Sequence, residues 1–205
     1  SDVYKRQLAW WRQWLGEDQA KPGQEKTHLT FIKESSKPNP FNIQVKGRWI
    51  EDQTWPPLSR NVSHLYLAAE GLTNQNVNAP SVQIHSPVET GVTAGEWVPH
   101  CSGTEITGCQ RSIDANSACF DSQVLEQSID IFGCPKMLIS LKSNSPTGHL
   151  IVRLCDVSPD GSSELVSIGT LNLTHRKGNQ NPLPMPVGKI QSLELKLDYM
   201  GHKFL

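Results

Sequence analysis

One short segment has the spacing of a hydrolase nucleophile. Gly91-Val92-Thr93-Ala94-Gly95 resembles the Gly-x-Ser-x-Gly turn that exposes a reactive serine between a strand and a helix. Threonine replaces the serine, however, and the flanking sequence predicts neither a strand before it nor a helix after it. A triad also needs an acid and a histidine after the nucleophile. We therefore expect no catalytic residue in this chain and no hydrolysis by the chain alone.

Metal-binding residue types are present but poorly spaced. None of the seven histidines has another at the short spacing that places two ligands on one face, so surface or hydrogen-bonded histidines are favoured. Asp156, Asp160 and Gly161 imitate part of a calcium loop, but the remaining oxygen ligands are absent, and a hairpin turn explains them better. The five cysteines form an odd set without a Cys-x-x-Cys pair, which indicates reduced, mostly buried thiols and favours a cytoplasmic location. We expect no metal and no cofactor.

Tryptophans are the remaining candidates for binding. Trp10, Trp11 and Trp14 lie at helical spacing, which favours packing against a neighbouring domain over a ligand platform. Trp97 differs because it follows Glu96 in a long irregular stretch, residues 73–117, and loops of such length usually serve a site or an interface. An indole there can line a pocket, although a structural role explains Trp97 equally well.

The elements that must position these residues are nearly all strands. A short amphipathic helix is predicted over Leu8–Leu15, and a polar connector follows to residue 26. Apolar alternation and turn signals then predict a series of short strands, with a hairpin turn at residues 158–162. The predicted strands cover residues 29–33, 49–50, 64–68, 127–131, 137–142, 149–157, a stretch starting near 165, and 192–198. Such a series argues for an all-β, two-sheet sandwich, and a jelly roll is the natural candidate.

Composition excludes several classes of partner. The chain of 205 residues has a formal net charge of −1 and no cluster of lysine and arginine, so neither nucleic acid nor a membrane surface is expected to bind. No apolar run approaches the ~20 residues of a membrane span, and the order of residues typical of a signal peptide is absent. Residues 1–7 fit nothing that follows, and we treat them as a candidate non-native junction.

Together, these segments resemble the C-terminal domain of the CocE/NonD serine hydrolases, also called the X-Pro dipeptidyl-peptidase C-terminal domain. Trp10–Gly16 is similar to the family's helix after the catalytic histidine. Two positions depart from the pattern: Cys109 precedes Gln110 and Arg111 where the family has aspartate, and residues 115–118 replace a more acidic run. The other similar segments are Lys46–Trp49 with Trp55-Pro56, Phe120–Leu125, Arg153–Val157 with Pro159–Gly161, and Leu171–Arg176.

The resemblance implies a galactose-binding-like jelly-roll β-sandwich that packs on an α/β-hydrolase domain of the same protein, helps to shape its acyl or peptide pocket, and can support a homodimer. The triad of such enzymes lies upstream, so none of it transfers to this chain. Glu96 and Trp97 match the segment that faces the active site, and they are the expected substrate-binding residues. The parent protein is expected to be an esterase or dipeptidyl-peptidase, with the choice of substrate left open.

The resemblance also divides the chain. Residues 8–26 are expected to be the helix and linker at the end of the hydrolase domain, and residues 27–205 the sandwich. Because the pattern is still extended at Leu205, we expect at least one further strand. Two alternatives remain. An autonomous carbohydrate-binding jelly roll would show a planar aromatic platform or a calcium site, and a purely structural or dimerisation domain would show an apolar patch without a pocket.

Overall fold

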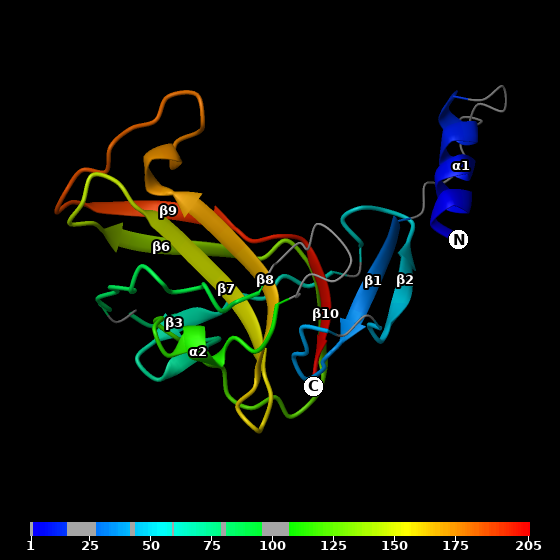
Figure 1. Cartoon of the computed structure of the whole chain (residues 1–205), viewed down its shortest axis with the longest axis horizontal. Coiled ribbons are helices and arrows are strands. Elements are labelled where there is room, and N and C mark those ends of the chain that lie inside the picture. Colours follow the sequence, from blue (N-terminus) through cyan, green and yellow to red (C-terminus); the bar gives the residue numbers. More distant parts are fainter. Residues whose placement is uncertain (1, 16–27, 42–43, 59, 79–80, 96–106) are drawn as a thin grey trace. The chain divides into compact units, whose positions relative to one another are not determined.

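The computed structural model of the protein describes residues 2–15, 28–41, 44–58, 60–78, 81–95 and 107–205. It divides into two compact units, one comprising Ser1–Leu29 with Ile50–Asn61 and the other Thr30–Trp49 with Val62–Leu205. Strands dominate the described residues, and the only long helix among them is at the N-terminus (Figure 1). The fold is the expected all-β sandwich with a short N-terminal helix.

Helix α1 (Asp2–Leu15) starts earlier than the sequence predicted. The apolar spacing marked a helix only from Leu8, but helix formation needs no apolar stripe, and the preceding Tyr4, Lys5 and Arg6 are compatible with a helix. Residues 2–7 thus continue the same helix. Within the described part of the chain, no helix combines the length and the apolar character that crossing a membrane requires.

The clearest alternation in the sequence produces the clearest pair of strands. Strand β6 (Lys136–Lys142) pairs antiparallel with β9 (Ile190–Lys196), and Met137 lies opposite Leu195 while Ile139 lies opposite Leu193. Such directly opposed apolar pairs on one face stabilise a sheet and set its register. The sequence placed β9 at residues 192–198; it ends at Lys196, although Leu197 is still buried.

Strands β7 (His149–Val157) and β8 (Ser163–Asn172) form the long hairpin seen in Figure 1. The predicted turn joins them: the amide of Ser158 donates to the carbonyl of Ser162 at 2.9 Å. Gly161 has φ of +78°, a conformation that favours glycine. Asp160 accepts hydrogen bonds from the amide and the hydroxyl of Ser162. The Asp-Gly pair therefore serves the turn, as predicted.

A four-stranded sheet brings together distant parts of the chain. Its order is β2 (Gly47–Asp52), β1 (His28–Glu34), β10 (Met200–Phe204) and β5 (Ile129–Gly133). Strand β10 runs parallel to β1, with Lys33 opposite His202, and antiparallel to β5. The sequence pattern did not predict β10, because a glycine and a histidine interrupt its apolar residues.

The long stretch after β3 (Tyr66–Ala68) and β4 (Gly71–Thr73) has little regular structure where the structure describes it. It contains one short helix, α2 (Arg111–Asp114), whose Ile113 is buried. The core itself lies between the strands in two apolar clusters, which hold the hairpin and the neighbouring pairs together. One cluster comprises Val166, Met200 and Phe204, with Leu125 and Leu154; the other comprises Leu173, Met185 and Leu193, with Ile139, Leu141, Leu150 and Leu171.

Candidate functional site

An arginine of the hairpin helps to fix the irregular segment around α2 to the sandwich. Arg153 projects from β7, and its guanidinium forms an ion pair with Asp114 at 2.8 Å. It also donates to the hydroxyl of Ser117 and to the side-chain oxygen of Gln110, both at 3.2 Å. The fork of a guanidinium suits several simultaneous acceptors, and this one is only 13 % exposed. Arg153 therefore contributes to the position of α2 against the hairpin.

A small polar hollow of about 100 Å³ lies beside α2. Typical ligand pockets have volumes of about 300–1,000 Å³, so the hollow has room only for a few waters or one small group. The hydroxyl of Thr90 is buried there and has no hydrogen-bond partner among the described residues. The hollow is lined by Pro87, Glu89, Thr90, Gly91, Thr93, Ser112, Ile113 and Asn116.

The segment that imitates a nucleophile turn has a different local structure. Successive turns link Pro87 to Thr90, Glu89 to Val92 and Gly91 to Ala94, each through a backbone hydrogen bond of 3.0 Å. The nucleophile turn instead requires a strand before it and a helix after it. The hydroxyl of Thr93 lies 3.4 Å from that of Ser112, another neutral hydroxyl, which offers no base to activate it.

The expected binding residues Glu96 and Trp97 lie outside the described residues. The structure does describe the chain on either side of them, up to Gly95 and again from Thr107. Among the tryptophans of α1, Trp10 and Trp11 are each 52 % exposed, and their rings meet edge to face at a centroid distance of 4.7 Å. An edge-to-face indole pair exposed on a helix is unusual for a residue that normally buries most of its surface.

A second cluster of chemically capable residues is buried between strands. His202 of β10 is hydrogen-bonded to Asp156 of β7, with 2.8 Å between Nε2 and Oδ2. Glu164 of β8 forms an ion pair with Lys33 of β1, and it accepts hydrogen bonds from the amide and the hydroxyl of Ser36. His202, Asp156 and Glu164 are each at least nine-tenths buried.

These three side chains could in principle hold a metal ion, because their ligand atoms lie within 4.8 Å of one another. The ammonium group of Lys33 already neutralises Glu164, and His202 already occupies a carboxylate oxygen of Asp156. A metal ion would have to displace both. The arrangement fits a buried network of paired charges, each satisfied by a partner, better than a metal centre.

The pKa of Asp156 reflects this pairing. Burial by itself raises the pKa of the carboxyl group, but hydrogen bonds from His202 and Ser35, with the positive charge of Lys33 nearby, bring it below its ordinary value. The carboxylate is therefore ionised in the folded protein at neutral pH. The neighbouring Cys155 differs, because its burial raises the pKa of the thiol to about 11, which keeps it protonated and unreactive.

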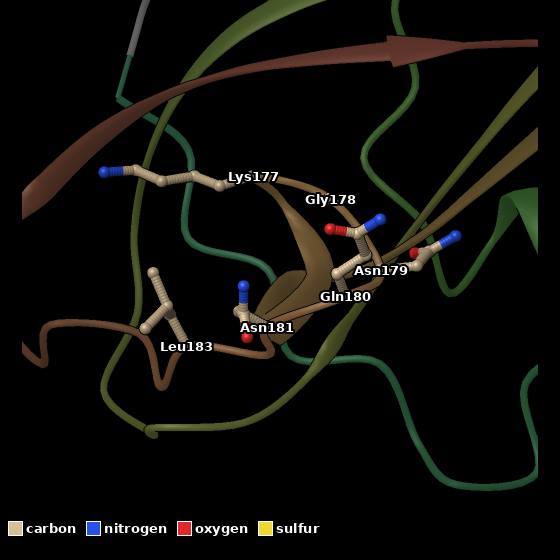
Figure 2. Close-up of a pocket in the computed structure, with 6 residues that line it drawn as sticks. All are labelled: Lys177, Gly178, Asn179, Gln180, Asn181 and Leu183. Atoms are coloured by element: carbon tan, nitrogen blue, oxygen red, sulfur yellow. The ribbon is translucent and has the colours of Figure 1, made fainter.

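A second hollow among the described residues offers little chemistry. It measures about 510 Å³ and lies over one exposed loop after the 3-10 turn η1 (Leu173–His175), with the amide side chains of Asn179, Gln180 and Asn181 around it (Figure 2). Lys177, Gly178 and Leu183 complete its lining. None of these six residues carries an aromatic ring, so the hollow lacks the stacking platform expected of a carbohydrate site.

Comparison with known proteins tests the family resemblance. The model of the X-Pro dipeptidyl-peptidase C-terminal non-catalytic domain matches residues 19–205. This chain belongs to that family. The X-Pro dipeptidyl-peptidase C-terminal domain expected from the motif order is thereby confirmed. A solved structure shares its fold. A CocE/NonD family hydrolase from Staphylococcus aureus matches 99 % of the chain with a TM-score of 0.65, at 13 % identity, and the match covers 36 % of that protein.

Two mycobacterial proteins, from Mycobacterium bovis and Mycobacterium tuberculosis, are also similar to this non-catalytic domain. Both are named as candidate serine esterases, and each is 26 % identical over 155 residues, which is 73 % of this chain. The aligned part is 25 % of each mycobacterial protein. The chain thus corresponds to about a quarter of the length of these curated relatives.

Sequence reasoning missed the buried cluster and the Arg153 anchor for the same reason. Both join residues that are far apart in the chain, such as Asp156 with His202 and Gln110 with Arg153. Short spacings between histidines indicate a metal site in a sequence, and His202 has no such neighbour. One signal was available: His202 stands between Met200 and Phe204, at the alternate positions that face a core.

Proposed function

We propose that the chain is the accessory C-terminal domain of a longer serine hydrolase that acts on acyl esters or X-Pro peptides. The observation that carries the proposal is the coverage: a non-catalytic family domain matches residues 19–205, while the similar mycobacterial proteins are about four times longer than the aligned part. Their additional length provides room for an α/β-hydrolase domain with the triad. An esterase is favoured over a peptidase because the two mycobacterial relatives are named as serine esterases.

In this proposal, the chain packs on the hydrolase domain through α1. Residues 8–26 then form the end of that domain and its linker, residues 27–205 form the sandwich, and residues 1–7 stay a candidate junction. The exposed pair Trp10 and Trp11 supports the docking role, because burying indole surface against a partner is strongly favourable. The proposed partner of α1 is an apolar groove on the surface of the α/β-hydrolase domain.

The second part of the proposal concerns the substrate pocket. We assign Glu96 and Trp97 to its wall, where a carboxylate and an indole can orient a bound acyl or peptidyl group. Two features beside them support this assignment. The chain that flanks them is held firmly to the sandwich near α2, and the polar hollow next to α2 contains the unpartnered hydroxyl of Thr90. A preorganised wall with spare polar groups is what substrate orientation requires.

The test uses the natural full-length protein, as wild type and as the variant Trp97→Ala. We expect a serine-reactive probe to label an upstream serine, and activated acyl esters or X-Pro anilides to be hydrolysed. Trp97→Ala should raise KM about tenfold with little change in kcat, because it removes binding made equally in the ground and transition states. Trp49→Ala is a suitable control, since it alters an exposed indole of β2 outside the proposed wall.

Two outcomes would contradict the proposal. A natural reading frame without a hydrolase domain would remove the accessory role, and binding of that protein to polysaccharides would then favour the carbohydrate-binding module. A hydrolase whose KM is the same for Trp97→Ala and wild type would leave the accessory role in place but remove Trp97 from the pocket.

A further inference from the structure

Lys33 and Glu164 form an ion pair that joins two parts of the chain 131 positions apart. Strand β1, which carries Lys33, belongs to the four-stranded sheet, whereas β8, which carries Glu164, pairs with β7. The side chain of Glu164 is only 9 % exposed, while that of Lys33 is 32 % exposed. The pair therefore connects two sheets, and water reaches it mainly from the side of the lysine.

The segment after β1 supplies two further hydrogen-bond donors to the same carboxylate. The backbone amide of Ser36 donates to Oε2 of Glu164 at 3.3 Å, and the hydroxyl of Ser36 donates to Oε1 at 3.2 Å. The ammonium group of Lys33 contacts Oε1 as well. Donors on both oxygens draw electron density away from the carboxyl carbon. The same kind of arrangement stabilises the oxyanion that forms when a nucleophile attacks a carbonyl group.

A group that can carry protons lies beside the pair. Asp156 offers a carboxylate oxygen within 4.8 Å of a carboxylate oxygen of Glu164. The hydrogen bond to His202, 2.8 Å long, holds the carboxylate of Asp156 in this position. Proton transfer during a reaction needs such a positioned acid or base close to the reacting atoms. A nucleophile, a polarised carboxyl group and a proton carrier thus meet at one buried point.

We propose that Lys33 and Glu164 become joined by an isopeptide bond, with Asp156 as the group that transfers the protons. This inference concerns a covalent modification of the sandwich itself and goes beyond the proposed function. No enzyme, metal or cofactor takes part in it. The bond would connect β1 permanently to β8, and the ion pair is its starting state.

The reaction balances with water as its only by-product. Asp156 carries one proton from the ammonium group to Oε1, which leaves a free amine facing a neutral carboxyl group. The amine nitrogen attacks the carboxyl carbon of Glu164, and the backbone amide of Ser36 holds the negative charge that develops on Oε2. Asp156 then moves a second proton from the nitrogen to Oε1. The bond between the carbon and Oε1 breaks, water leaves, and nothing is oxidised or reduced.

Two physical effects favour the amide over the ion pair. Reacting groups held in contact reach effective concentrations of about 10⁵ M or more, so condensation competes with hydrolysis as it does not between free molecules. Burial also penalises two charged groups and favours a neutral product. The released water can leave along the partly exposed side chain of Lys33.

A second lysine of the same segment provides an internal control. Lys37 also bonds a carboxylate of the hairpin, that of Asp160, with 2.6 Å between the nitrogen and the oxygen. The side chain of Lys37 is 78 % exposed and that of Asp160 is 47 % exposed, so both groups stay hydrated. Hydration stabilises the charges and lets water compete with the amine. We expect this pair to remain an ion pair.

The experiment measures the mass of the natural full-length protein after complete denaturation. Wild type should be lighter than its sequence requires by the mass of one water, and digestion should release a branched peptide that joins Lys33 to Glu164. Lys33→Arg keeps the positive charge but has no nucleophilic amine, so it should have the full mass. Lys37→Arg is the matched control and should lose one water like wild type. Asp156→Asn should slow formation of the bond about a hundredfold, followed by mass after refolding.

Three results would contradict the proposal. A wild-type protein that keeps its full mass after prolonged folding would overturn it. A loss of water that persists in Lys33→Arg would also overturn it, because ring closure at an asparagine or an aspartate releases water too. An unchanged rate in Asp156→Asn would remove Asp156 from the reaction.

The branched peptide keeps the test decisive if a variant is unstable. Should Lys33→Arg not fold, the presence of this peptide in wild type supports the bond, and its absence excludes the bond. None of these measurements depends on hydrolase activity. Failure of the proposed function, which Trp97→Ala tests through KM, is therefore distinguishable from failure of the isopeptide bond.

Discussion

Individual buried polar residues link strands that lie far apart in the sequence. Asp156, Glu164 and His202 each find a charged or hydrogen-bonding partner inside the sandwich, and Gln110 finds one for its side-chain oxygen and for its nitrogen. A buried polar group without a partner is costly, so each of these pairs also specifies which strands meet. Removing one partner should therefore cost more than the pair contributes in net stability.

The pH dependence of stability follows from Asp156. Its folded-state pKa lies below its ordinary value of about 3.9, so the ionised form stabilises the fold above that pH. The contribution is lost as the pH falls from about 4 through the folded-state pKa, because the unfolded chain binds the proton first. The free energy of unfolding, measured in urea across this range, should decline less steeply with acid for Asp156→Asn than for wild type. An identical decline in both proteins would contradict this prediction.

Thr90, unlike the paired residues, is predicted to gain stability when its polar group is removed. Its buried hydroxyl has no partner among the described residues, so removing it should relieve a cost and not add one. We expect Thr90→Val, which keeps the shape, to leave the free energy of unfolding unchanged or to raise it by up to about 1 kcal/mol. Thr90→Ser keeps the hydroxyl and serves as the control. A loss of more than about 1 kcal/mol in urea denaturation would mean that the hydroxyl has a partner in the folded protein.

At the level of elements, the sequence predicted most of the strands, but it predicted none at β4 or β10. Strands β6, β7 and the hairpin turn between β7 and β8 follow the predicted ranges closely, because one apolar face and a Pro-Asp-Gly turn leave few alternatives. Strand β10 was missed because its inward residues include a histidine that is buried only through its pairing with Asp156. Such tertiary partners are invisible to a local pattern.

The same limit applies to the candidate site. The resemblance predicted that Glu96 and Trp97 line a pocket, and this stays a prediction because both lie outside the described residues. The sequence could not show that Gln110 and Arg153 hold the flanking chain, because that depends on side chains meeting across the fold. It also could not show how tightly the strands pack. Gly169 of β8, for example, looks like an ordinary strand residue in the sequence.

Gly169 tests the packing of β8 on the strand behind it. A Cβ atom at this position would lie 2.6 Å from the carbonyl oxygen of Lys196, a backbone atom that cannot move aside easily. We expect Gly169→Ala to lower the free energy of unfolding by about 1–3 kcal/mol, as overpacking of a core does. Gly108→Ala is the control, because its Cβ would meet only Pro40 at 3.9 Å. Equal stability of the two variants in urea denaturation would show that β8 and β9 can separate freely.

At the scale of the whole molecule, we propose that the chain works beside another domain of a longer protein. The family match and the coverage of about a quarter of the curated relatives agree with this view. The docking role proposed for α1 can be tested on its tryptophans. Their exposure of 52 % each leaves roughly half of each indole available to a partner.

In the natural full-length protein, replacing Trp10 and Trp11 with serine should weaken the coupling between domains. We expect a joint loss of about 2–4 kcal/mol of interdomain stabilisation, from the apolar area that the two indoles no longer bury. Calorimetry should then show separate unfolding transitions where wild type shows coupled ones. Leu58→Ser is the control, since Leu58 is 93 % exposed in the same compact unit but lies outside the helix. Unaltered coupling in the tryptophan variant would exclude α1 as the docking surface.

The parallel pairing of β1 with β10 has a consequence for how the chain folds during synthesis. Lys33 and His202, which lie opposite each other, are separated by most of the chain, and long-range pairing of this kind is slow to form. A ribosome releases β1, β7 and β8 well before β10. Until β10 is released, Asp156 lacks its hydrogen-bond partner His202. The edge of β1 that pairs with β10 is also unpaired, and an unpaired edge can associate with other chains. The nascent domain is therefore most exposed to aggregation just before β10 emerges.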